Sequence, residues 1–209
     1  MKVLFVGASG TIGGGVLDQC LAHPNITTVI AFVRRDLLPA VTGNIKLRCV
    51  IKKDFARWED NELRAHADAA AVICPERPFR FLLLSGKFVT RNQDKTLWFL
   101  EKPRKLKGQL ESKTMNLAQQ HPSRWQAYVA RPGGIISNGK IVGQDGLGAA
   151  LGGLGSMLGK NWAIKLEELG AFMAEAAANG GDDDGLIENA RLVEKGRELL
   201  GRRAQSTAP

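Results

Sequence analysis

Three glycines near the start of the chain have the type and spacing of a phosphate-binding turn. Gly7, Gly10 and Gly13 follow the apolar run at residues 2–6 and open a segment with helical spacing. In that context the first glycine permits a tight turn, the second admits a pyrophosphate to the backbone N–H groups, and the third lets the helix pack closely on the strand. The residues expected to line this site are Gly7, Ser9, Gly10, Thr11, Ile12 and Gly13. A glycine turn that binds no ligand is the alternative.

Further candidates follow the next two apolar runs. The run at residues 27–33 ends at Arg34 and Arg35, where a dinucleotide fold places an acid for the ribose of NAD or an arginine for the 2′-phosphate of NADP. Two guanidiniums can pair with a phosphate dianion, so NADP(H) is preferred over NAD(H). Asp36 could still reach a ribose, which leaves NAD(H) open, and the arginines could be solvated turn residues. Asp54, after the third run, lies where the adenine edge would be read.

Strands and helices alternate along the chain and would position these residues. Apolar, β-branched runs predict strands at residues 2–6, 27–33, 46–51, 79–84 and 127–130. Helical spacing predicts helices at residues 12–21, 56–72, 103–121, 166–178 and 186–200. Residues 139–160 are rich in glycine and predict a mobile loop. This alternation indicates an α/β fold with a doubly wound parallel sheet covered on both faces, plus C-terminal helices.

Two of the expected helices carry additional signals. Leu106, Leu110 and Leu117 are spaced for one apolar face, and Pro103 suits the first turn of the helix that carries them. Asp182 to Asp184 precede the last helix and suit its positive end.

Composition and charge narrow the class of protein. The 209 residues, 44% of them hydrophobic and 24% charged, suffice for a single domain with a sizeable core. The net charge of +8 gathers at residues 34–53 and 87–107, which favours an anionic ligand, either a phosphorylated cofactor or a nucleic acid. Because no nucleic-acid motif accompanies the basic clusters, we expect no specific nucleic acid as partner.

Cysteine usage and hydropathy bear on the compartment. Cys20, Cys49 and Cys74 form no CxxC pair and have no histidine pair nearby, so neither disulfides nor a metal site are expected. The chain shows no targeting segment, and its most membrane-like stretch at residues 146–159 is too short and too rich in glycine to span a bilayer. We therefore expect a soluble, cytoplasmic protein with a small-molecule substrate, no membrane partner and an open oligomeric state.

Five sequence motifs together resemble a known family. They are MKVLFVGASGTIGGGVL at the start, VRRDL after the second strand, FRFLLLSG, LKGQLE and YVARPGGI. They are similar to the atypical, extended-like short-chain dehydrogenase/reductases, including the NAD(P)-binding and NmrA-like proteins frequent in fungi, over the chain to about residue 195. The resemblance implies a Rossmann-like sheet and an NADP(H)-dependent oxidoreductase acting on a small carbonyl or alcohol, with secondary metabolism as one setting.

The resemblance also assigns catalytic positions. By motif match, Ser85 is the serine that binds the substrate carbonyl, and Lys107 is the lysine that supports the proton-donating tyrosine. That tyrosine should stand four residues before Lys107, where this chain has Pro103, and the only tyrosine, Tyr128, falls inside a strand. His23 and His121 are expected to be surface helix caps. The alternative function is therefore a catalytically impaired NAD(P)-binding regulatory or sensor protein.

The chain is also short for this family. Between the strands at residues 46–51 and 79–84, only residues 69–74 offer a fragment of the expected additional strand and helix. We therefore expect one βα unit to be missing from a single domain over residues 1–209. Within that domain, residues 161–201 form the helices on the substrate side.

Overall fold

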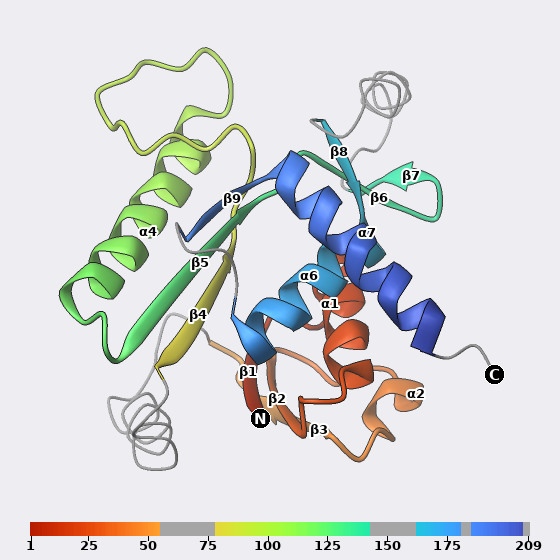
Figure 1. Ribbon diagram of the computed structural model, residues 1–209. Helices are drawn as coiled ribbons and strands as arrows, with labels where there is room; N and C mark the ends of the chain where they lie inside the picture. Colours follow the sequence, from red (N-terminus) through yellow and green to blue (C-terminus); the bar gives the residue numbers. More distant parts are fainter. Residues whose placement is uncertain (55–77, 143–161, 181–184, 207–209) are drawn as a thin grey trace. The chain divides into compact units, whose positions relative to one another are not determined.

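The computed structural model describes residues 1–54, 78–142, 162–180 and 185–206. Two compact units make up the chain (Figure 1). Unit 1 comprises Met1–Asp54, Pro132–Gly180 and Glu188–Pro209, and unit 2 comprises Phe55–Arg131 and Gly181–Ile187. Each unit therefore combines segments that are distant in the sequence.

A parallel three-stranded sheet in unit 1 carries the start of the chain. Its strands are β1 (Lys2–Val6), β2 (Thr28–Val33) and β3 (Leu47–Ile51), in the order β1-β2-β3. The register pairs Val6 with Phe32 and Val33 with Ile51, so the carboxyl ends of all three strands meet at one edge. The sequence predicted these strands correctly because β2 is a run of buried, mostly β-branched residues.

The described helices of unit 1 pack on this sheet or on one another, with close contacts at glycines. They are α1 (Thr11–Ala22), the short α2 (Pro39–Thr42), α6 (Leu166–Asn179) and α7 (Asn189–Ser206). Helices α1 and α2 contact the sheet, and α6 packs along α1 on one side and α7 on the other (Figure 1). A Cβ atom at Gly15 would lie 2.6 Å from the Leu166 side chain, and one at Gly170 would lie 3.0 Å from the Gly15 carbonyl oxygen. The two helices approach this closely because both crossing positions are glycine.

A second small sheet completes unit 1. It contains β6 (Gly134–Ser137), β7 (Lys140–Ile141) and β8 (Ala163–Lys165) in the order β7-β6-β8. Strand β6 runs antiparallel to β7 and parallel to β8. The predicted loop at residues 139–160 therefore begins with a strand, and residues 143–160 of it lie outside the described residues.

In the described part of unit 2, a sheet has one helix packed against it. The strands are β4 (Phe79–Leu84), β5 (Trp125–Arg131) and β9 (Leu186–Glu188), in the order β4-β5-β9, and the helix is α4 (Glu101–Gln120). Strands β4 and β5 are parallel, as predicted.

The predicted helix at residues 186–200 was wrong at its start. Residues Leu186–Glu188 form β9, and α7 begins only at Asn189. Strand pairing overrides helical spacing here, because the Val129 N–H donates to the Gly185 carbonyl at 2.6 Å and Ile187 is 1% exposed. Asp182 to Asp184 lie outside the described residues.

The predicted apolar face of α4 was also wrong. Leu106, Leu110 and Leu117 are exposed, whereas the buried residues of the helix are Gly108, Glu111 and Thr114. A Cβ atom at Gly108 would lie 1.7 Å from the Thr90 carbonyl oxygen, so the preceding loop presses directly against the helix backbone. Tight backbone packing and a buried charge therefore orient this helix in place of an apolar stripe.

Residues 55–77, between β3 and β4, where one βα unit was expected to be missing, lie outside the described residues. They include the predicted helix at residues 56–72, the fragment at residues 69–74 and Cys74. Within the described residues β1 pairs only with β2, and its Leu4 and Val6 are 38% and 62% exposed. No helix in the described part of the chain is long and apolar enough to cross a membrane.

Candidate cofactor site and active site

The glycine turn after β1 has the backbone geometry that its sequence predicted. Gly7 has φ of +93°, a conformation that residues with a Cβ atom rarely adopt, and the Gly10 N–H donates to the Gly7 carbonyl at 3.1 Å. A Cβ atom at Gly13 would lie 1.9 Å from the Gly7 carbonyl oxygen, so only glycine allows α1 to start this close to β1. Two of the three glycines are thus required by the fold itself.

The N-terminus of α1 is open to an anion. Gly10 is the N-cap, no side chain caps the helix, and the first turn contains no acidic residue. The first N–H groups of a helix lack partners within the helix, and its dipole adds partial positive charge there. Ser9, Gly10 and Thr11 are exposed at this turn, and Ile12 is half-buried behind them. These residues fit the phosphates of a dinucleotide.

The other predicted cofactor residues lie at the same edge of the sheet. Arg34 and Arg35 directly follow β2, and Asp54 follows β3 by three residues. All three are exposed, and neither arginine has an ion-pair partner among the described residues. Because the strands are parallel and in register, unit 1 brings the glycine turn, the arginines and Asp54 to one edge.

Ser85 lies directly after β4 in unit 2, and its hydroxyl group donates a hydrogen bond to a carboxylate. It is 8% exposed, its N–H donates to the Ala130 carbonyl at 2.8 Å, and its Oγ donates to Glu111 Oε1 at 2.5 Å. An ionised carboxylate can only accept hydrogen bonds, so the hydroxyl proton of Ser85 points at Glu111.

Glu111 is the centre of a buried charged cluster that the sequence analysis missed. It is 0% exposed, and it accepts hydrogen bonds from Ser85, from Arg91 Nε at 3.0 Å and from two nitrogens of Arg131, including Nε at 3.0 Å. Burial alone would raise the pKa of Glu111, but the hydrogen bonds from Arg131, Ser85 and Arg91 outweigh it and lower that pKa overall. The sequence signal was available only as an acid in LKGQLE and an arginine at the end of β5, because the contact between them is tertiary.

The structure does not join Ser85 to Lys107. Lys107 is exposed on α4, and among the described residues its ammonium group has no hydrogen bond or ion pair. Pro103 stands four residues earlier, at the third position of the helix. Tyr128 is buried within β5, and its hydroxyl donates to Gln126 Oε1 at 3.4 Å. In the described part of the chain, Ser85 therefore has a carboxylate partner and no phenol.

The predicted surface position of His23 was wrong. His23 follows α1 as its C-cap but is 3% exposed, with Nε2 2.9 Å from Glu175 Oε2 on α6 and Nδ1 accepting the Asn25 N–H at 3.2 Å. Because Nδ1 is an acceptor, Nε2 carries the proton and donates to Glu175. The residue links α1 to α6. His121, the C-cap of α4, is exposed as predicted.

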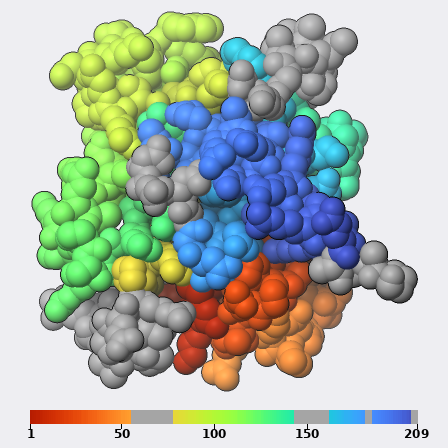
Figure 2. Space-filling view, viewed as in Figure 1, coloured from red at the N-terminus to blue at the C-terminus, as the bar shows by residue number. Residues whose placement is uncertain are grey.

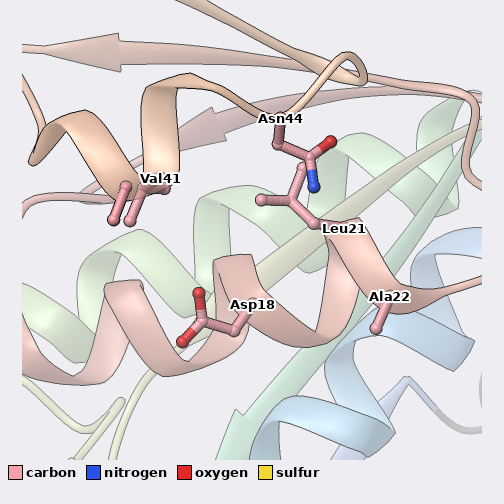
Figure 3. Close-up of a pocket in the computed structure, with 6 residues that line it drawn as sticks. Asp18, Leu21, Ala22, Val41 and Asn44 are labelled. Carbon is pink, nitrogen blue, oxygen red and sulfur yellow. The ribbon is translucent and has the colours of Figure 1, made fainter.

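A hollow of about 290 Å³ lies between α1 and α2 (Figure 3). Figure 3 shows Asp18 and Leu21 of α1 on one side, with Val41 and Asn44 on the other. The hollow is formed by the C-terminal half of α1, and none of the predicted site residues lines it. It is therefore distinct from the glycine turn at the other end of that helix.

Solved structures identify the fold. The reductase domain of PhqB from Penicillium fellutanum superposes with a TM-score of 0.57 at 11% identity, over 90% of this chain and 66% of that domain. Gre2 from Candida albicans in complex with NADPH gives a TM-score of 0.61 at 14% identity, over 90% of this chain and 78% of that one. The fold is a Rossmann-like α/β fold.

Other comparisons define how far this likeness extends. The dTDP-glucose 4,6-dehydratase of Bacillus anthracis in complex with NAD superposes with a TM-score of 0.55 at 11% identity, over 96% of this chain and 81% of that one. No protein-family model and no curated protein matches the sequence. The structural neighbours include proteins bound to NAD and to NADPH, and the likeness is one of fold.

Proposed function

We propose that unit 1 binds NADP(H). The observation that carries this proposal is the turn between β1 and α1, where the positive φ of Gly7 and the contact at Gly13 leave the first N–H groups of α1 free for a pyrophosphate. Arg34 and Arg35, at the same edge of the sheet, favour the 2′-phosphate of NADP(H). When bound, the nicotinamide supplies or accepts a hydride.

The double variant Arg34→Ala/Arg35→Ala tests the cofactor preference. Removing two charge-assisted contacts should weaken NADPH binding by about tenfold to a hundredfold and leave NADH binding nearly unchanged. Calorimetric titration of the purified protein with each cofactor measures both affinities. Arg48→Ala is the matched control. Arg48 is an exposed arginine of β3 that lies opposite Ile30 of β2, away from the carboxyl ends of the strands. Equal losses for the two cofactors, or no saturable binding by the unaltered protein, would contradict the proposal.

Two activities are compatible with this site, and the structure favours one of them. The first is an oxidoreductase of the short-chain type for a small carbonyl or alcohol, with Ser85 and Lys107 as the residues that would contact the substrate. The second is a cofactor-binding sensor or regulatory protein without turnover. The bond from Ser85 Oγ to Glu111 favours the second, because it directs the hydroxyl proton of Ser85 at a buried carboxylate and a substrate carbonyl would have to compete for it.

Consumption of NADPH separates these two activities. With a panel of small aldehydes and ketones, we expect absorbance at the NADPH band to stay at the background rate. Ser85→Ala should then leave both the rate and the NADPH affinity unchanged, and Ser112→Ala on α4 serves as the matched serine control. Turnover that Ser85→Ala abolishes while NADPH still binds would establish the oxidoreductase instead.

A further inference from the structure

The loop between β4 and α4 exposes a cluster of large apolar side chains. Phe88, Trp98, Phe99 and Leu100 are 58%, 95%, 57% and 57% exposed, and we call them the apolar loop tip. The rings of Trp98 and Phe99 lie 5.8 Å apart. Figure 1 shows the loop arching beyond the start of α4, and Figure 2 shows its yellow-green side chains at the surface. Exposed aromatic residues in such a group mark an interaction surface.

Hydrogen bonds and a close backbone contact brace this loop. Arg104 donates from Nε to the Phe88 carbonyl at 2.5 Å and from Nη1 to the Phe99 carbonyl at 3.2 Å, so one guanidinium ties the two ends of the loop together. The loop also presses on α4 where Thr90 meets Gly108. Little conformational entropy is therefore lost when the apolar loop tip binds a partner.

Positive charge surrounds the apolar loop tip. Residues 87–107 contain seven basic and two acidic side chains. Lys95 and Lys102 flank Trp98 to Leu100, and both are exposed without an ion-pair partner among the described residues. Of the two acids, Glu101 is paired with Lys105 at 2.6 Å, and the exposed Asp94 offsets the charge of one lysine. The charge that remains near the tip is positive and available to an anionic partner.

We propose that the apolar loop tip docks on the surface of an anionic lipid bilayer. Tryptophan prefers the headgroup region, phenylalanine and leucine can enter the acyl boundary, and lysines nearby attract anionic headgroups. The exposed aromatic rings could also stack on bases, but the aliphatic side chains of Leu100 and of the exposed Leu106 cannot, so the mixed apolar surface fits a bilayer better than a nucleic acid. Peripheral docking requires no helix that spans the bilayer. The proposal therefore differs from the sequence-based expectation of no membrane partner, which rested on the lack of a long apolar segment. The surface lies in unit 2 and does not depend on NADP(H) binding.

Vesicle co-sedimentation tests the proposal. The full chain should bind vesicles of phosphatidylcholine with about 30% phosphatidylserine, bind pure phosphatidylcholine far more weakly, and dissociate as salt is raised. Trp98→Ala/Phe99→Ala and Lys95→Glu/Lys102→Glu should each reduce binding by about tenfold or more. The matched controls are Ile45→Ala, at a fully exposed apolar residue of unit 1, and Lys140→Glu, at an exposed lysine of β7. All four variants alter surface side chains, and circular dichroism verifies that they fold.

Three results would overturn the proposal. The first is no binding to anionic vesicles, or binding that the loop variants leave unchanged. The second is a dimer in solution that Trp98→Ala/Phe99→Ala dissociates, which would assign the tip to a second copy of the chain. The third is tighter, loop-dependent binding of a single-stranded oligonucleotide than of vesicles, which would assign it to nucleic acid.

Discussion

Replacing Gly13 with alanine should destabilise unit 1 by about 3 kcal/mol and abolish NADP(H) binding. The added Cβ would lie 1.9 Å from the Gly7 carbonyl oxygen and 2.6 Å from its carbon, and both are backbone atoms that no side-chain rotation can move. Helix α1 must therefore shift away from β1, which displaces the N–H groups expected to hold the pyrophosphate. Urea unfolding followed by circular dichroism, together with a calorimetric NADPH titration, measures both effects.

Gly14→Ala is the matched control for this substitution. A Cβ atom at Gly14 meets only the Ala8 carbonyl oxygen at 3.7 Å, an ordinary contact, and alanine favours a helix by about 0.5–1 kcal/mol over glycine. This neighbouring variant should be as stable as the unaltered protein or more so, and should retain NADPH binding. If the two variants behave alike, the close packing of α1 on β1 does not determine the site.

Glu111→Gln should destabilise unit 2 by about 3–5 kcal/mol. The amide keeps the shape of the carboxylate but loses its charge, so Arg91 and Arg131 are left uncompensated around a side chain that is 0% exposed. Urea unfolding followed by tryptophan fluorescence measures the loss, because Trp98 and Trp125 lie in this unit. Glu101→Gln is the matched control on the same helix, and its unfolding midpoint should change far less because that glutamate forms a partly exposed pair with a single lysine, Lys105.

The same carboxylate predicts how stability depends on pH. Because the pKa of Glu111 is lowered in the folded protein, its stabilisation is fully present above the ordinary glutamate value of about 4.3 and is lost as pH falls through the lowered folded value. Unfolding free energy should therefore decrease on acidification below about pH 5, and less steeply in Glu111→Gln. A variant with the same acid dependence as the unaltered protein would show that Glu111 does not carry the effect.

The sequence predicted the elements whose information is local. The glycine turn, α1 and strands β1 to β5 follow from short apolar runs and glycine spacing, and Ser85 was placed correctly at the end of β4. The sequence did not predict the hydrogen-bond partner of Ser85, because Glu111 lies on α4 and nothing in the local sequence joins these two residues.

The wrong predictions share a tertiary cause. Leu106 and Leu110 have the spacing of a buried face, yet α4 turns Gly108 and Glu111 inward because a close backbone contact and two arginines are available there. His23 has the position of a surface cap, yet Glu175 from a distant helix makes burial of its imidazole favourable. A buried charge with a partner far along the chain cannot be distinguished from an exposed one by spacing alone.

The contact between Gly15 and Gly170 has a consequence for how the protein is made. Strands β1 to β3 and α1 leave the ribosome long before α6 and α7, whose packing covers α1. During that interval the side chains of Val16, Leu17 and Leu21, buried in the finished fold, have no cover from those helices. Packing between segments this far apart in the sequence slows folding, so we expect the first third of the chain to expose these side chains to chaperones during synthesis.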